Sequence, residues 1–422
     1  MISNPSISKL HGWLLILLTA WLVASVAYHG LENGVGEDFS GFYHAAQRLN
    51  LNQPLYIAER MPYCFPPTLA LCLKPLATLS FRDAFKCWGL LNIAFLFAGV
   101  AIYATAVFSR RFEPVATCLI LITCFRFWPT SCELGLFGNC NCLLFIFVCA
   151  LFASFGARRF LASALVIASG AAIKTWMIGL AATLVWQRRW KDLLYCLAAF
   201  GGALACLFSA VGWQEWSMFR QTTSTFLNRH NLLFNYQPAQ SIMGFARVHF
   251  LENGNAHALA NSPLLEATFV IVGFAALAAG AFYVLTHPAK DAFESRLHLG
   301  FFVTSLLLAL PVCDPQYLIL ALPALWSVLV PPSEDAHRLP KAAWIAAVFI
   351  YIAGTRIQYS SLPQFHDLSG WKSLLISDGF FWLASLWGVL LACIIFVNRK
   401  ERTTVKPALA GVADAPIAAP IS

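Results

Sequence analysis

Ten apolar segments of this chain are predicted to cross a lipid bilayer as helices. Such a helix needs about 20 predominantly apolar residues to cross a hydrocarbon core of roughly 30 Å. Of the 422 residues, 59% are hydrophobic and only 11% are charged, too little charge to cover soluble domains. We therefore predict an all-α polytopic membrane protein. The predicted spans are Leu10–Tyr28, Phe85–Phe108, Pro114–Trp128, Asn139–Phe155, Leu193–Gly212, Pro263–Thr286, His298–Val312, Gln316–Val330, Ala342–Tyr359 and Gly379–Asn398.

A further apolar segment, Phe160–Trp186, is interrupted by Lys174 and has basic residues at both ends. Basic clusters favour the cytoplasmic side of a membrane, so this segment should enter and leave on the same side. We predict a re-entrant hairpin of two half-helices with Lys174 near the turn. Non-helical backbone at that depth is tolerated only where protein or a water-filled cavity surrounds it.

Lysine and arginine gather at the ends of the apolar segments, and this placement orients membrane helices. The pattern predicts a multi-pass protein of the plasma (inner) membrane with both termini in the cytoplasm. Two large segments, His29–Ala84 and Trp213–Ser262, would then face the periplasm or exterior. The basic residues behind the net charge of +8 are therefore explained by membrane orientation. No continuous basic surface can be drawn that would indicate nucleic-acid binding. Residues 1–406 should form one membrane domain, with residues 407–422 as a disordered cytoplasmic tail.

Asp38 follows the first span, within Glu37-Asp38-Phe39-Ser40. An aspartate at the start of a helix commonly caps it. A carboxylate at the edge of an outward-facing site can instead act as a general base that takes a proton from an attacking hydroxyl. Glu37 is adjacent and can share that role, so the sequence leaves the assignment open.

Lys174 and Asp314 are the other candidates that the residues themselves suggest. An ammonium within an apolar segment is costly unless it faces a cavity or a counter-ion. Lys174 could meet an anion such as a lipid phosphate, or it could pair with a buried acid such as Glu133. Asp314 lies before Pro315 in a short outer turn, where it is either an ordinary turn residue or a substrate contact.

Motifs for nucleotide chemistry are missing from the sequence. It contains no Gly-x-Gly-x-x-Gly, Walker loop, His-Glu-x-x-His or nucleophile elbow. An outward-facing enzyme would also lack a supply of nucleotide sugars, so its substrate would arrive on a lipid. No residue cluster requires a metal, and we expect neither a metal nor another cofactor.

Several short motifs follow one another in an order typical of one family of membrane enzymes. In the first outer segment they are Asp38-Phe39, Tyr43-His44-Ala45-Ala46, Asn52-Gln53-Pro54-Leu55-Tyr56 and Tyr63-Cys64-Phe65-Pro66-Pro67. Later come Gly138-Asn139-Cys140-Asn141, Ala172-Ile173-Lys174, and Gln240-Ser241-Ile242 with Gly244 and Arg247. From Asp38 to Pro323 the chain resembles glycosyltransferase family 87. It departs from the family pattern at Phe65, Asn139 and Ala239, where the family has Tyr, Gln and Asn.

The resemblance implies a GT-C fold and a polyprenyl-phosphate sugar, typically mannose, as the donor. Asp38 would be the base that activates a hydroxyl of a lipid or glycan acceptor, and displacement would invert the anomeric carbon. Lys174 and Arg247 would stabilise the phosphate of the donor. Further substrate contacts would come from Tyr43, Tyr63, Asn141, Asp314 and Tyr317.

Other functions fit the same pattern. A transporter or flippase for lipid-linked sugars would also use a broken hairpin with a buried lysine, although the sequence has no internal repeat to support it. A polysaccharide ligase or polymerase would share the topology and the lipid-phosphate substrates. A non-catalytic scaffold would need neither Asp38 nor Lys174.

Overall fold

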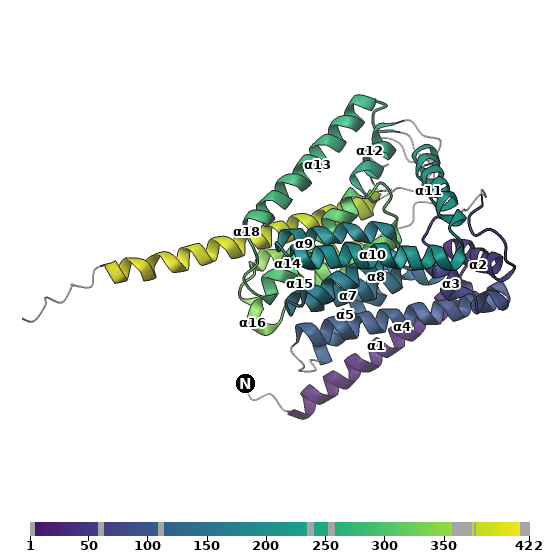
Figure 1. The fold of residues 1–422 in the computed structure, drawn as a ribbon. Helices are drawn as coiled ribbons and strands as arrows, with labels where there is room; N and C mark the ends of the chain where they lie inside the picture. Colours follow the sequence, from purple (N-terminus) through teal and green to yellow (C-terminus); the bar gives the residue numbers. More distant parts are fainter. Residues whose placement is uncertain are drawn as a thin grey trace, which may run out of the picture.

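The computed structural model describes residues 5–57, 63–108, 114–233, 240–251, 258–356, 374 and 377–413. Within these ranges all regular structure is helical (Figure 1). In chain order the elements are α1 (Pro5–Asn33), α2 (Glu37–Asn50), α3 (Thr68–Leu73), η1 (Leu76–Thr78), α4 (Phe81–Val107), α5 (Pro114–Phe125), α6 (Trp128–Ser131), η2 (Cys132–Phe137), α7 (Asn141–Gly156), α8 (Phe160–Ile173), η3 (Thr175–Ala181), α9 (Ala182–Trp186), α10 (Trp190–Val211), α11 (Gln214–Leu233), α12 (Ile242–Phe250), α13 (Pro263–Thr286), α14 (Ala292–Ala309), η4 (Pro315–Ala321), α15 (Leu322–Leu329), α16 (Ser333–Ala336), α17 (Lys341–Gly354) and α18 (Asp378–Ala413).

The all-helical membrane architecture is confirmed, and each of the ten predicted spans overlaps a helix or a helix pair, although residues 357–359 of the ninth lie outside the described part of the chain. Five helices of the described residues are long and apolar enough to cross a membrane alone, in α1, α4, α10, α13 and α18. A sixth crossing is formed if α5 and the following Trp128–Phe137 segment, bent by 63°, count as one span. The other apolar helices, such as α7 with 16 residues and α17 with 14, are shorter than a bilayer normally requires.

The centre of the bundle is held by aromatic contacts with satisfied polar tips. Tyr103 of α4 lies edge-on to Trp326 of α15, with ring centroids 5.2 Å apart, and its hydroxyl is 3.2 Å from Ser327 Oγ. Trp326 Nε1 donates to Thr123 Oγ1 at 2.8 Å. Helices surrounded by lipid gain little from hydrophobic burial against one another, so close packing and such interhelical hydrogen bonds hold them together.

The predicted re-entrant hairpin is present as α8, η3 and α9. Lys174 separates the two arms with an extended backbone, φ −130° and ψ 110°. The guanidinium of Arg158, before the first arm, donates to Lys290 O, and Trp186 Nε1, at the end of the second, donates to Val284 O at 3.1 Å. One end of the hairpin therefore meets the connection between α13 and α14 and the other meets the last turn of α13, so both ends lie on the same side and Lys174 lies at the tip.

The segment between α1 and α4 is tied to α11 and to the tip of the hairpin. Glu215 Oε2 of α11 accepts hydrogen bonds from the backbone N–H groups of Leu55 and Tyr56, at 3.2 and 3.3 Å. The Thr68 hydroxyl donates to Ala172 O, two residues before Lys174. Figure 1 shows α2, α3 and α11 gathered at one end of the molecule.

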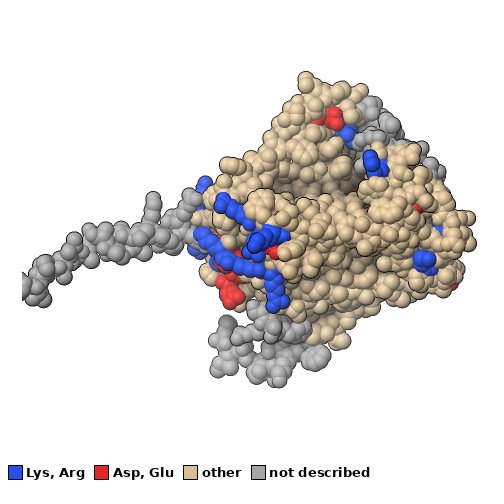
Figure 2. Space-filling view, in the orientation of Figure 1, with Lys and Arg blue, Asp and Glu red and all other residues tan. Residues whose placement is uncertain are grey.

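Charged side chains gather at the opposite end. Arg338 forms ion pairs with Asp291 at 2.6 Å and with Glu294 at 2.9 Å, and Arg296 pairs with Asp335 at 3.1 Å. Figure 2 shows most of the visible lysine and arginine side chains grouped around this end. The N-terminal end of α1 and the C-terminal end of α18 lie toward the same end (Figure 1).

The last helix, α18, ends further along the chain than expected. α18 continues to Ala413, past Pro407, where a disordered tail was predicted to begin. The remaining residues of that tail, 414–422, lie outside the described part of the chain.

Candidate active site

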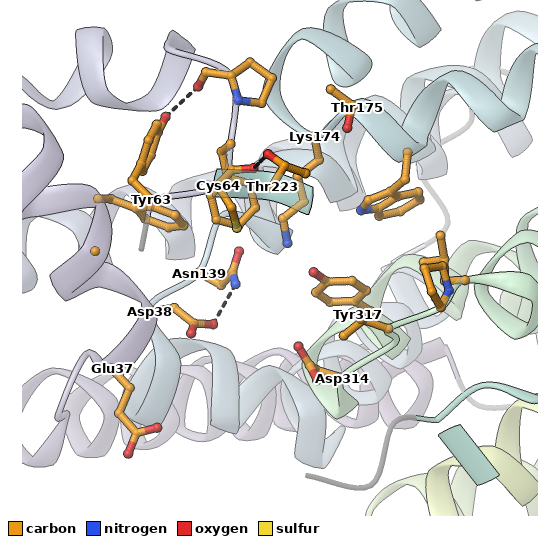
Figure 3. A pocket seen from close by; sticks show the side chains of 18 residues that line it. Glu37, Asp38, Tyr63, Cys64, Asn139, Lys174, Thr175, Thr223, Asp314 and Tyr317 are labelled. Atoms are coloured by element: carbon orange, nitrogen blue, oxygen red, sulfur yellow. Dashed lines mark hydrogen bonds between the residues drawn. The ribbon is translucent and has the colours of Figure 1, made fainter. Parts of the chain in front are cut away.

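A cavity of about 260 Å³ lies where α2, the hairpin tip and the start of η4 meet. The lining residues are Glu37, Asp38, Gly41 and Phe42 of α2, residues 63–66, Asn139, residues 174–176, Thr223 of α11, and Leu310, Pro311, Val312, Asp314 and Tyr317. Figure 3 shows Asp38 and Asn139 on one side and Tyr317 and Asp314 on the other, with the Lys174 amine directed between them. Segments far apart in the sequence thus place a carboxylate and an ammonium in one cavity.

Asp38 lies in the first turn of α2, where the helix N-terminus favours a negative charge. The nearby Gly36 has φ 66°, a left-handed conformation that favours glycine. A Cβ at this position would lie only 2.7 Å from the Phe85 ring. Asn139 Nδ2 donates to Asp38 Oδ2 at 2.6 Å, and Gln316 Nε2 donates to the same oxygen at 3.3 Å. Two amides therefore fix one oxygen of the carboxylate, and Oδ1 forms no hydrogen bond within the described residues.

The environment of Asp38 suits a proton acceptor. Burial raises the pKa of Asp38 above its usual value, while the Asn139 hydrogen bond, the Lys174 charge and the Gln316 hydrogen bond oppose the rise. Burial, together with the neighbouring Asp38 charge, also raises the pKa of Glu37. Glu37 is exposed, and Figure 3 shows its side chain directed away from Lys174, so Asp38 is the better placed of the two carboxylates.

Lys174 is 1% exposed and lies at the wall of the cavity. Its Nζ donates to Asn141 Oδ1 at 3.1 Å and lies 4.1 Å from the centroid of the Tyr317 ring and 5.2 Å from that of Phe65. Such cation–π contacts stabilise an ammonium without neutralising it. Within the described residues Lys174 forms no ion pair, and the suggested acid, Glu133, reaches it only through Asn141.

The side of the cavity opposite Asp38 is built from the turn before η4. Burial raises the pKa of Asp314 to about 7, with the Asp38 charge adding to the rise and the Lys174 charge opposing it. The Tyr317 ring stacks on Trp176 with centroids 5.9 Å apart, and Trp176 Nε1 is buried with no hydrogen-bond partner among the described residues. This wall therefore offers an aromatic face and an unused donor to a ligand.

Three tyrosines were predicted to contact substrate, and the structure brings Tyr63 and Tyr317 to the cavity but not Tyr43. Tyr43 is five residues from Asp38, which places it on a different face of α2. Its ring lies edge-on to Phe81 and its hydroxyl donates to Leu79 O at 2.6 Å, so its role is packing. Tyr63 lines the cavity, although its hydroxyl is occupied by Pro66 O at 2.5 Å.

Arg247 also lies away from the cavity lining. It belongs to α12, which packs against α13, and its Nε lies 3.7 Å from Glu266 Oε1. The structure therefore does not bring Arg247 to the cavity that Lys174 lines, where a shared role at the phosphate was predicted. Asn141 does not line the cavity either, but it contacts Lys174 directly.

Sequence reasoning gave no site role to Gln316, Trp176 or Thr223, and it treated Asn139 only as a departure from a family pattern. The available signal was chemical, because Asn139 keeps the amide of the family's Gln and can still donate to a carboxylate. Among the described residues, no group of three or more His, Cys, Asp and Glu side chains could hold a metal ion.

A family model described as glycosyltransferase family 87 matches residues 63–311, more than half of the chain. No curated protein matches. Among solved structures, the chain is similar to the crystal structure of ArnT from Cupriavidus metallidurans bound to undecaprenyl phosphate. That similarity has 12% sequence identity and a TM-score of 0.42, and it covers 97% of this chain and 82% of ArnT.

Proposed function

This chain belongs to glycosyltransferase family 87, and from that premise we propose that it transfers a hexose from a polyprenyl-phosphate donor to a lipid or glycan acceptor. Mannose is the sugar that the family resemblance implies. The family match begins after Asp38, so the role of this residue depends on its position in the cavity.

The observation that carries the proposal is that Asp38 and Lys174 line the same cavity. With Oδ2 held by Asn139 and Gln316, Oδ1 of Asp38 is the oxygen available to an acceptor hydroxyl. In the proposed reaction this hydroxyl gives its proton to Oδ1 while its oxygen attacks the anomeric carbon. The bond from that carbon to the phosphate oxygen breaks, and the electron pair leaves with the polyprenyl phosphate.

Lys174 is proposed to stabilise the negative charge that develops on the leaving phosphate. Its ammonium is already oriented by Asn141 and by the Tyr317 ring, so little reorganisation accompanies charge development. Attack from the side opposite the leaving group inverts the anomeric carbon. The aromatic wall of Tyr317 and Trp176 is proposed to face the sugar.

We further propose that the cavity opens on the outer side of the plasma membrane. The basic side chains and the ends of α1 and α18 lie at the end opposite α2 and α11 (Figures 1 and 2). Because basic residues are retained in the cytoplasm, that end and both termini are assigned to the inside. A donor carried by a membrane lipid can reach such a site without a cytosolic nucleotide sugar.

The proposal is tested with purified protein and radiolabelled polyprenyl-phosphate mannose. Wild type is expected to transfer label to a lipid or glycan acceptor. Asp38→Asn is expected to lower the rate by at least about a hundredfold, because an amide cannot accept the proton. Glu37→Gln serves as the matched control and should keep most of the rate. Full turnover by Asp38→Asn would remove Asp38 as the base, and movement of an unconsumed sugar lipid across vesicles would favour a transporter.

A further inference from the structure

Glu133 is a fully buried acid that the proposed reaction does not use. It belongs to η2, a single π-helical stretch in which Gly138 N donates to Glu133 O at 2.9 Å. The stretch ends at Gly138 in a left-handed conformation, φ 62°. Such wide turns inside helical segments occur frequently at functional sites. Burying a carboxylate costs free energy unless hydrogen bonds satisfy it, so its hydrogen-bond partners indicate its role.

Both oxygens of Glu133 accept hydrogen bonds from Asn141. The backbone N–H of Asn141 donates to Oε1 at 2.8 Å, and its side-chain Nδ2 donates to Oε2 at 3.0 Å. An amide side chain has one donor end and one acceptor end. With Nδ2 bound to Glu133, the amide oxygen faces the other way, where it accepts from Lys174 Nζ at 3.1 Å.

We propose that Glu133 is a positioning residue that acts through Asn141 to hold the Lys174 ammonium at the cavity wall. The carboxylate decides which end of the Asn141 amide meets the lysine. Because the contact is relayed by a neutral amide, the positive charge of Lys174 is not neutralised by a direct ion pair. That an anionic phosphate uses this charge rests on the proposed function, whereas the relay itself does not.

A merely structural role is the alternative. Asn141 is the first residue of α7, and the first N–H groups of a helix have no partner within it. Glu133 therefore also accepts a hydrogen bond from one of these N–H groups. The informative substitution is Glu133→Gln, because a glutamine has one acceptor oxygen for the two Asn141 donors. If the introduced glutamine donates from its NH₂ group to Asn141 Oδ1, the Asn141 amide turns and presents its own NH₂ end to Lys174.

The first measurement is the rate at which acetic anhydride modifies Lys174, followed by mass spectrometry. In wild type, the hydrogen bond to Asn141 Oδ1 holds the Lys174 amine in place at the cavity wall. Glu133→Gln is expected to speed modification of Lys174 by at least about threefold, because an amine that has lost its acceptor is no longer held against Asn141 and can reach the reagent. Glu133→Asp, which retains two acceptor oxygens, should restore slower modification. An unchanged rate in a folded Glu133→Gln protein would overturn the proposal.

Glu215→Gln is the matched control for this measurement. Glu215 is also buried and also accepts two N–H hydrogen bonds, but its partners are Leu55 and Tyr56. Its substitution should leave modification of Lys174 unchanged. If Glu215→Gln and Glu133→Gln speed it equally, the effect is general loosening of the fold and the relay is wrong.

The second measurement is the transfer rate in a double-mutant cycle. Glu133→Gln is expected to lower kcat by about tenfold, the size of one hydrogen bond to a charged group. In a Lys174→Ala background the same substitution should have little further effect, because the two residues act as a unit. A loss that persists without Lys174 would overturn the relay while leaving the transferase intact. If wild type transfers nothing but Lys174 modification responds as expected, only the proposed function fails.

Discussion

At the residue scale, the site depends on the orientation of amides around two opposite charges. Asn139 and Gln316 donate to one oxygen of Asp38, and Asn141 accepts from Lys174. Amide side chains stay neutral over the whole physiological range, so they can fix a carboxylate and an ammonium without cancelling either charge. Charge and direction are thus controlled by different residues.

The Asn139 hydrogen bond makes a prediction for the pH dependence of transfer. Asp38 must be ionised to act as a base, so the rate falls as the pH drops through its pKa. The Asn139 donor favours the ionised form, and Asn139→Ala should therefore raise this pKa further. We expect the acidic limb of the pH–rate profile to move to higher pH, measured as kcat from about pH 4 to about pH 9.

Gln316→Ala provides a graded comparison for Asn139→Ala. Its donor lies 3.3 Å from Asp38 Oδ2, against 2.6 Å for Asn139, so its removal should move the limb less. A limb that stays in place in Asn139→Ala, or moves to lower pH, would contradict the assignment of Asp38 as the titrating base.

At the scale of elements, broken helices bring the site together. The hairpin of α8, η3 and α9 carries Lys174 into the bundle, and the π-helical turn η2 directs Glu133 toward Asn141. Hydrogen bonds from α4 fix the turn between η2 and α7, because Trp88 Nε1 donates to Gly138 O at 2.7 Å. The break in the helix at Lys174 is tolerated because protein surrounds it, as the 1% exposure of Lys174 indicates.

Arg338 joins elements at the basic end and should affect stability without affecting chemistry. It pairs with Asp291 at 2.6 Å and with Glu294 at 2.9 Å, and Glu294 is 3% exposed. Arg338→Ala leaves the Glu294 carboxylate with only the Lys290 N–H hydrogen bond and no ion-pair partner, and it should lower the free energy of unfolding by about 1–3 kcal/mol. We expect a lower unfolding temperature with an unchanged kcat below it.

Arg82→Ala is the control for Arg338→Ala. The Arg82 side chain is 74% exposed and lies 3.8 Å from Glu32, so its removal should change stability by less than about 0.5 kcal/mol. Equal melting curves for Arg338→Ala and wild type would show that this ion-pair cluster does not stabilise the bundle.

At the scale of the whole molecule, the separation of charged end and cavity predicts an orientation in the membrane. Thr78 is exposed at the end of η1, and Lys191 is exposed at the start of α10. A membrane-impermeant maleimide should label Thr78→Cys in intact cells and Lys191→Cys only after permeabilisation. The background should lack the two exposed native cysteines, Cys72 and Cys206. The reverse pattern would place the cavity in the cytoplasm.

Much of the helical layout could be predicted, because hydrophobic length and basic flanks act locally along the chain. The hairpin around Lys174 followed from the same two signals and is confirmed. Span lengths were less predictable, since α7 and α17 are shorter than a bilayer requires. Hydrophobicity alone does not reveal where a helix bends or ends inside a bundle.

The site was only partly predictable. Asp38, Lys174, Asp314 and Tyr317 were singled out because a charge beside or within an apolar segment is costly or because they belong to a family motif, and all four line the cavity. Tyr43 also belonged to a recognisable motif, but motif membership does not specify which face of a helix meets the cavity, and the structure uses it for packing.

The sequence by itself determined that the chain is helical, lies in a membrane and folds back at Lys174, because burial of apolar length and exclusion of charge depend on neighbouring residues alone. Only the tertiary structure decided which distant side chains meet. It brought Asn139 and Gln316 to one oxygen of Asp38 and connected Glu133 to Lys174 through Asn141. Hydrogen-bond partners are fixed within a few tenths of an ångström by packing between helices, which no local pattern encodes.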